Sequence, residues 1–166
     1  MGVRLERLPE YGVTLEIFTG ALTPELLFGR LRALREGDGA RWILYIDPSV
    51  DLSRVDIASI PELKRANAAR LKALNIDDPR IAFVCDPGEH ERETFDFWLR
   101  YVQLRHEHPG SQELFRTLAE ACAWLGLPEG ACGAARGAVT EAVEAEASSG
   151  RGAEAAPEGD LSERRL

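Results

Sequence analysis

Apolar and polar positions alternate in two runs near the start of the chain. The first run covers residues 3–8 and the second covers residues 13–18, with Pro9-Glu10-Tyr11-Gly12 between them. An alternation with a period of two is typical of strands that bury one face. Two such runs joined by a short turn-forming segment predict a β-hairpin.

Three later segments predict further strands. Residues 42–46 and 81–85 are continuously apolar, and each is followed by an Asp-Pro pair. Short, continuously apolar segments are typical of strands that are covered on both faces, as in parallel sheets. A shorter strand is predicted at residues 113–116, after the break at Pro109-Gly110.

Helical spacing of apolar residues predicts a helix between each of these strands and one after the last. Thr23-Pro24 begins the first helix, and a third helix runs from about residue 91 to 105. The segments beginning at Ser59 and Thr117 have the form of capping boxes, with a glutamate three residues after the hydroxyl. The predicted order is ββαβαβαβα, an α/β fold with a mixed, largely parallel sheet.

The composition changes after this region. Residues 1–128 carry the predicted elements, whereas residues 129–166 are rich in alanine, glutamate and glycine and have almost no large apolar side chains. A segment with little apolar surface to bury does not offset the entropy of ordering its backbone. We therefore expect one domain followed by a disordered, acidic tail.

Charge and cysteine content narrow the expected environment and partners. The formal net charge is −8, which argues against binding to nucleic acids or to anionic membrane surfaces. No segment approaches the roughly 20 apolar residues of a spanning helix, so we expect a soluble protein without a membrane span. Three cysteines without metal-type spacing fit a reduced, cytoplasmic protein. No nucleotide-binding or other cofactor motif is found, and we expect no cofactor.

Three segments carry a resemblance to a known family. They are Trp42–Asp47 with the following Asp51-Leu52-Ser53, then Arg80–Val84, and finally Leu114–Leu125. In order and pattern the chain resembles, over residues 3–127, the STAS-like proteins of bacteria, specifically the group related to the sporulation anti-sigma-factor antagonist. This group is also described as STAS/SEC14-like. The resemblance implies a non-catalytic regulatory module with a STAS-like fold.

The family also implies a switch position. Its best-known members are regulated by phosphorylation of a serine at the start of the helix that follows the central strand. Here Ile57 stands where that serine would be, and the nearest hydroxyl is Ser59. Ser59 is therefore a possible phosphorylation site, but the same hydroxyl suits a helix cap with Glu62, and we favour the cap.

A thiol-dependent enzyme or redox protein is the main alternative function. Cys85 ends the continuously apolar segment 81–85, which is predicted to be a buried strand, and His90 follows in the next loop. The loop is acidic, which disfavours a reactive thiolate, so a buried and inert thiol is the preferred interpretation. The triplet His106-Glu107-His108 suits the end of a helix better than a metal site, and we predict neither a catalytic residue nor a metal ligand.

The predicted third helix carries a wide apolar arc. One stripe contains Phe95, Trp98, Leu99 and Val102, and a neighbouring stripe contains Phe97, Tyr101 and Leu104. If the first stripe faces the sheet, the second remains as a possible interface, most simply in a two-fold homodimer. Broad core packing of both stripes is the alternative. The leading hypothesis is a cytoplasmic binding module that acts through a protein partner or a small apolar ligand.

Overall fold

The computed structural model describes residues 2–85, 91–104 and 110–152. Its centre is a five-stranded sheet in which the strands follow one another in chain order. The first two strands are antiparallel, and every later neighbouring pair is parallel. The α/β class and the mixed, mostly parallel sheet are thus confirmed. The strands are β1 (Val3–Leu8), β2 (Val13–Phe18), β3 (Arg41–Ile46), β4 (Arg80–Cys85) and β5 (Ser111–Phe115).

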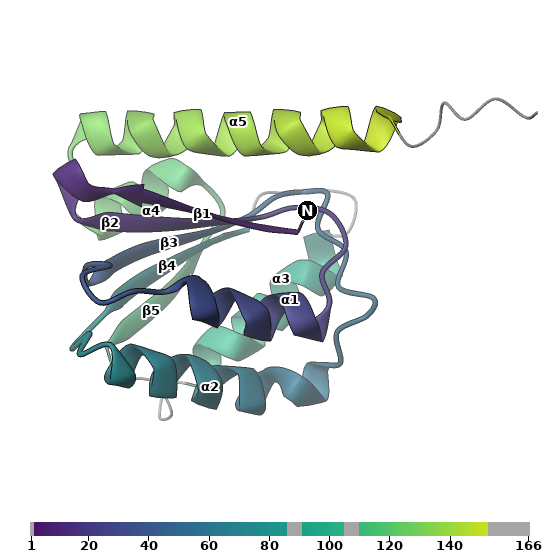
Figure 1. Cartoon of the computed structure of the whole chain (residues 1–166), viewed down its shortest axis with the longest axis horizontal. Coiled ribbons are helices and arrows are strands. Elements are labelled where there is room, and N and C mark those ends of the chain that lie inside the picture. Colours follow the sequence, from purple (N-terminus) through teal and green to yellow (C-terminus); the bar gives the residue numbers. More distant parts are fainter. Residues whose placement is uncertain (1, 86–90, 105–109, 153–166) are drawn as a thin grey trace, which may run out of the picture.

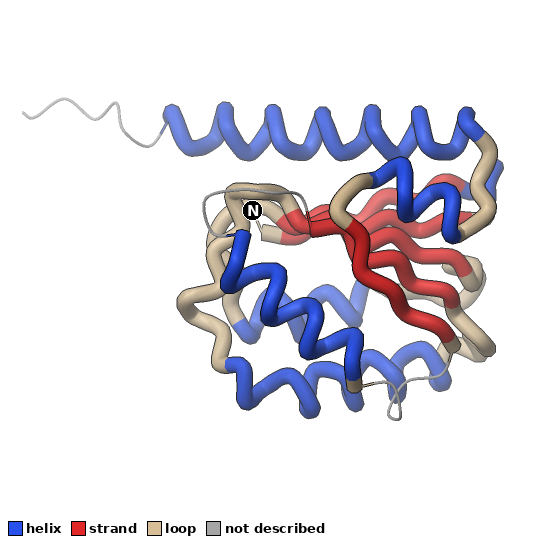
Figure 2. The backbone as a smooth tube through the Cα atoms, turned by 180° about the vertical axis from the view of Figure 1, so that it is seen from behind, coloured by secondary structure: helices blue, strands red, loops and turns tan. Residues whose placement is uncertain are grey.

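Helices cover both faces of the sheet, which gives three layers (Figures 1 and 2). One face carries α1, α2 and α3, and the other carries α4 and α5. Their bounds are α1 (Pro24–Gly29), α2 (Ile60–Ala73), α3 (Glu91–Gln103), α4 (Leu118–Trp124) and α5 (Glu129–Gly152). Short 3-10 helices are η1 (Pro9–Tyr11), η2 (Arg30–Ala33), which continues α1, and η3 (Ile57–Ser59), which leads into α2.

Alternate residues of the central strands point into two separate hydrophobic clusters. In β3, Leu44 and Ile46 join the cluster under α1, α2 and α3, whereas Ile43 and Tyr45 join the cluster under α4 and α5. The alternation follows from the strand geometry, because successive side chains project to opposite faces. Since both faces are covered, β3 and β4 consist largely of apolar residues, as expected for interior parallel strands.

Two helix starts agree with the sequence-based prediction. Thr23 accepts a hydrogen bond from the backbone N–H of Leu26 at 3.3 Å and begins α1 just before Pro24. Thr117 and Glu120 form a complete capping box at α4, since each side chain accepts from the other residue's backbone N–H. These contacts satisfy N–H groups that have no partner within a helix.

The predicted capping box at Ser59 is wrong. Ser59 lies in the short η3 helix and makes no capping hydrogen bond to α2; instead its Oγ donates to the carbonyl oxygen of Asp56. Asp56 provides the cap, because its side chain accepts from the N–H of Ala58 at 2.9 Å. The helical region therefore starts three residues before the position that the sequence pattern indicated.

The expected disordered tail does not describe residues 129–152, which form the long helix α5. Its inward positions Ala131, Ala135, Val139 and Ala142 are buried, and the last three belong to the hydrophobic cluster on the face of the sheet that carries α4. Their spacing of four, four and three residues places them on one side of a helix. Small side chains let the helix approach β1 and β2 closely, so a segment with few large apolar residues still buries a continuous stripe. Residues 153–166 lie outside the described part of the chain.

Two glycines permit close backbone packing. Gly110 has φ of 80° beside Pro79, and a Cβ there would lie 2.0 Å from the Pro79 carbonyl oxygen. Gly130 lies in the first turn of α5 against η1, where a Cβ would lie 2.9 Å from the hydroxyl of Tyr11. Gly110 is required for steric reasons and for its left-handed backbone, whereas at Gly130 a larger residue would require only that the Tyr11 side chain move.

Candidate functional site

A groove of about 570 Å³ lies between the segment that follows β3 and the first half of α3. It lies beyond the carboxyl end of the central strand β3. Its walls combine apolar side chains with two carboxylates. The lining residues are Asp51, Leu52, Ser53, Val55, Ile57, Glu93, Thr94 and Phe97.

Hydrogen bonds hold the wall formed by residues 47–56. Asp51 accepts from the N–H of Ser53 at 2.8 Å and from its hydroxyl at 3.0 Å. The backbone of Asp51 also pairs with the segment that follows β2, since its N–H donates to Gly20 and its carbonyl accepts from Leu22. The wall is therefore anchored to the sheet although it lies outside the strands.

The base of the groove comes from α3 and the core. Phe97 and Val55 are buried and belong to the hydrophobic cluster on this face of the sheet. Thr94 is also buried, and its hydroxyl donates to the carbonyl oxygen of Val50 at 3.5 Å. These contacts join α3 to the segment after β3, so both walls rest on packed elements.

Ile57 gives the groove its unusual apolar rim. Its side chain is 46% exposed, and among the described residues it is the one large hydrophobic side chain in the exposed class. Single exposed apolar residues are common on protein surfaces. Ile57 differs from such residues because it lies beside a groove whose deeper surface is also apolar.

The charged side chains that line the groove are both acidic. Asp51 is half-buried and Glu93 is exposed, and the neighbouring Asp56 and Arg54 are exposed on the same segment. The lining therefore favours a bound group that carries positive charge next to its apolar part.

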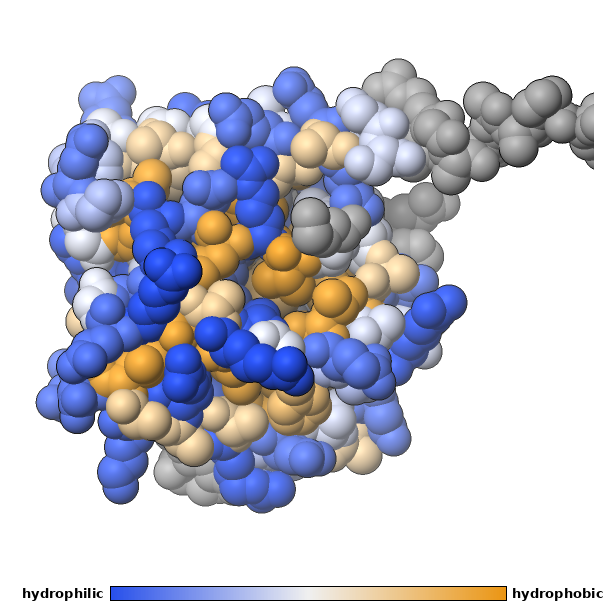
Figure 3. All heavy atoms as spheres, in the orientation of Figure 1, coloured by the Kyte–Doolittle hydropathy of each residue, from blue (hydrophilic) through white to orange (hydrophobic). Residues whose placement is uncertain are grey.

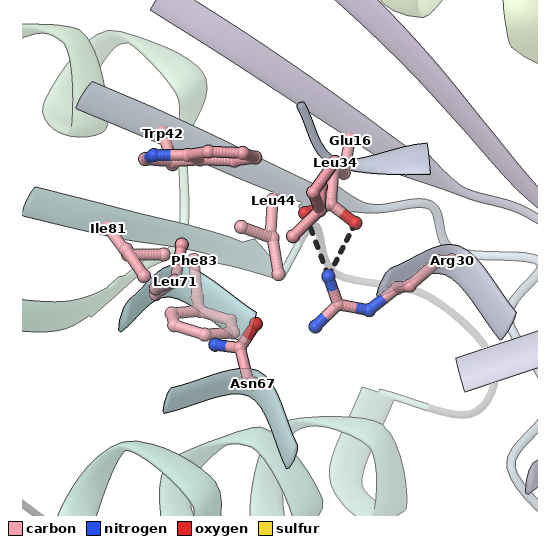
Figure 4. Close-up of a pocket in the computed structure, with 9 residues that line it drawn as sticks. All are labelled: Glu16, Arg30, Leu34, Trp42, Leu44, Asn67, Leu71, Ile81 and Phe83. Atoms are coloured by element: carbon pink, nitrogen blue, oxygen red, sulfur yellow. Dashed lines mark hydrogen bonds and ion pairs between the residues drawn. The ribbon is translucent and has the colours of Figure 1, made fainter. Parts of the chain in front are cut away.

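A second polar feature lies inside the core beneath α1 and α2 (Figure 4). Glu16 of β2 and Arg30 of η2 form a buried ion pair in which Arg30 Nη1 donates to both carboxylate oxygens, at 2.8 and 2.7 Å. Arg30 Nε has no hydrogen-bond partner among the described residues. The pair borders a cavity of about 10 Å³, which has room for roughly one water molecule. It is too small to be a binding site for a ligand.

Two residues of α2 connect this pair to the end of α3. Asn67 lines the small cavity, and the buried Lys64 donates from Nζ to the carbonyl oxygen of Tyr101. Burial raises the pKa of Tyr101 to about 12, and the Arg30 cation and the Asn67 side chain act in the opposite direction. Lys64 satisfies a carbonyl in the last turn of α3, so this polar cluster supports the helix that forms one wall of the groove.

The predicted interface on α3 is wrong for two of its three residues. Phe97 is 2% exposed and Tyr101 is fully buried, and both pack against Trp98 in the core. Leu104 is half-buried and packs on the same cluster. The arc is wide because α3 contacts both the strands β4 and β5 of the sheet and the neighbouring helix α2, which agrees with the alternative of broad core packing.

The candidate thiol site is only partly described. Cys85 is buried at the end of β4, at 1% exposure, whereas His90 and the triplet His106-Glu107-His108 lie outside the described residues. Cys122 of α4 and Cys132 of α5 are hydrogen-bonded neighbours; burial raises the pKa of Cys122 to about 12, and Cys132 acts in the same direction. A raised pKa keeps a thiol protonated and makes it a poor nucleophile.

Sequence reasoning found the chain segments of the groove but not the groove itself. The pattern predicted β3 and α3 separately, whereas the groove depends on how the segment after β3 folds back towards Gly20. The Glu16–Arg30 pair was also missed. The local pattern gave no signal for it, because Glu16 occupies a polar position of the alternating segment 13–18. Its burial depends on Arg30 and the helices that cover this face of the sheet.

Comparisons with known proteins do not identify a relative. The chain matches none of the protein-family models, curated proteins or solved structures with which it was compared. Within the part of the chain that the structure describes, no helix is long and apolar enough to cross a membrane. The same residues contain no cluster of three or more side chains suited to holding a metal ion.

Proposed function

We propose that the chain is a non-catalytic, cytoplasmic binding module of the STAS-like type, and that it binds a segment of a protein partner in the groove between the β3–α2 connection and α3. The exposed Ile57 beside this groove is the observation that carries the proposal. Ile57 is 46% exposed, so covering the rest of its side chain contributes about half of the roughly 1.5–3 kcal/mol that full burial gives.

The position of Ile57 argues against control of the proposed binding by a kinase. The resemblance assigns to this position the serine through which the family's members are switched. An isoleucine accepts no phosphate, so contact with a partner here is constitutive rather than controlled by a kinase. Ser59 is less suited to phosphorylation than an exposed serine, because its half-buried hydroxyl is already hydrogen-bonded to Asp56.

The chemistry of the groove suggests what the partner presents. Leu52, Val55 and Phe97 provide apolar contacts, while Asp51 and Glu93 add negative charge. An apolar side chain with a lysine or arginine next to it in sequence matches both features.

A small apolar ligand is the second candidate, because the groove's volume lies within the range of small-molecule sites. A thiol-dependent enzyme has less support. Cys85 is almost inaccessible in the folded chain, and a nucleophile must reach its substrate.

Selection of peptides from a random displayed library against the whole chain tests the proposal. We expect the selected peptides to carry an apolar residue beside a basic one. Ile57→Ser should weaken their binding by roughly three- to tenfold, as the loss of this partly exposed apolar contact implies. Glu93→Lys should also weaken it, whereas Glu36→Lys, an equal charge change at an exposed position outside the groove lining, should leave it unchanged.

Backbone amide shifts measured by NMR with a selected peptide should map to residues 51–57 and the start of α3. Peptides that bind equally well to wild type and Ile57→Ser would contradict the proposal. Neutral apolar fragments that shift the same amides, in the absence of any selected peptide, would favour the small-ligand candidate instead.

A further inference from the structure

Strand β1 forms an edge of the sheet with a defined set of outward backbone groups. The N–H of Thr19 donates to the carbonyl oxygen of Gly2 at 3.0 Å, which makes these two residues a hydrogen-bonded pair facing β2. Such pairs alternate along an antiparallel ladder, so residues 4, 6 and 8 also face β2. The N–H and carbonyl groups of Val3, Leu5 and Arg7 therefore point away from the sheet.

This edge is open in the described structure. Figure 1 looks onto β1, with α5 on one side and α1 on the other, and no labelled element lies in front of the strand. Figure 3, in the same orientation, shows apolar side chains gathered between these helices. Val3, Leu5 and Leu8 of β1 and Phe28 of α1 are half-buried apolar residues on these elements. An open strand edge with adjacent apolar surface is suited to pairing with another strand.

We propose that β1 pairs with β1 of a second copy of this chain, antiparallel and about a two-fold axis at Leu5, so that the two sheets become continuous. This edge is separate from the groove, and pairing here replaces the interface expected on α3. A two-fold axis makes the strand its own partner, and hydrogen bonding requires that outward residues meet outward residues.

Charge selects the register. Axes at Arg4, Leu5 or Glu6 all bring outward residues opposite one another. The first places Arg4 opposite its own copy and the last places Glu6 opposite its own copy, and like charges directly opposite are destabilising. The axis at Leu5 places Arg4 opposite Glu6 twice and lets Val3, Leu5 and Arg7 all take part in the ladder.

The two charged side chains are available for this pairing. Arg4 Nε donates to Glu6 Oε1 at 2.5 Å within the strand, so both lie on the face of β1 towards α5. Their side chains are 41% and 32% exposed, and a second contact joins Arg4 to Glu141 of α5 at 3.3 Å. Exposed pairs of this kind contribute little to folding, which leaves the residues open to substitution.

Exchange of the charges tests the register. Wild type should sediment as a dimer, and Arg4→Glu or Glu6→Arg should each sediment as a monomer, because each places like charges opposite one another. An equimolar mixture of the two variants should associate, since every glutamate of one chain then meets an arginine of the other. Glu144→Arg, a charge change at an exposed position of α5, should remain dimeric.

Amide hydrogen exchange gives a second measurement. The amides of Val3, Leu5 and Arg7 should be protected in wild type and lose that protection on dilution to the monomer. A wild-type chain that is monomeric at submillimolar concentration would overturn the proposal, as would single variants that stay dimeric or a mixture that does not associate. If a variant fails to fold, the exchange of these three amides in wild type still tests the proposal. A wild-type dimer in which they are not protected would show that it does not form through the edge of β1.

Discussion

The burial of Glu16 and Arg30 depends on the whole fold and not on their local sequence. In the sequence, Glu16 reads as the polar, solvent-facing position of an alternating strand. The structure buries it, at 2% exposure, because β2 lies inside the sheet and α1 with η2 covers that face. The strand itself could be predicted from its local pattern, but the burial of Glu16 depends on residues far along the chain.

Removal of one partner of this pair should be strongly destabilising. We expect Glu16→Leu and Arg30→Met each to lower the free energy of unfolding by about 3–5 kcal/mol, because each leaves a buried charge without its counterion. The double variant should be more stable than either single variant, since no buried charge remains. Urea unfolding of the four proteins measures the coupling. Additive losses in the double variant would show that the two side chains do not act as a pair.

At the scale of elements, a helix or strand could be predicted when its signal lies within its own segment of the sequence. The strands could be predicted because period-two alternation and continuous apolar runs are local signals. The Thr117 capping box was confirmed for the same reason. The predicted start of α2 was wrong because Asp56, and not Ser59, provides the cap. The prediction of disorder for residues 129–152 was wrong because the small residues of α5 carry little apolar signal. The groove could not be predicted, since it depends on contacts between elements.

Helix α5 should be an integral part of the fold, and one substitution distinguishes this from a loosely attached segment. Ala135 is fully buried, whereas Ala145 on the same helix is exposed. Ala135→Glu should lower the free energy of unfolding by several kcal/mol, about the cost of burying an unpaired charge or losing the helix contact. Ala145→Glu should change it by less than about 0.5 kcal/mol. Equal thermal stabilities for the two variants would mean that α5 does not pack on the sheet in solution.

At the scale of the whole molecule, the two faces of the sheet have different roles. The face under α4 and α5 is filled mainly by small and aliphatic side chains. The face under α1, α2 and α3 holds the Glu16–Arg30 pair, Lys64 and Tyr101, and its outer end forms the groove. Polar groups that must be satisfied together restrict how these helices can pack, so this face supports the proposed site with a fixed geometry.

The buried Tyr101 should make global stability fall at alkaline pH. Burial raises its pKa from the ordinary tyrosine value of 10.0 to about 12, so in the unfolded chain it loses its proton at a lower pH than in the folded chain. Its contribution is fully present below about pH 10 and is lost as the pH rises towards 12. By about pH 11 the loss should be roughly 1 kcal/mol, and it should be absent in Tyr101→Phe.

Cys122 contributes in the same direction, so the two proteins must be compared at each pH. Urea unfolding at about pH 9 and about pH 11 measures the difference, and parallel losses in wild type and Tyr101→Phe would show that Tyr101 ionises as freely in the folded chain as in the unfolded one.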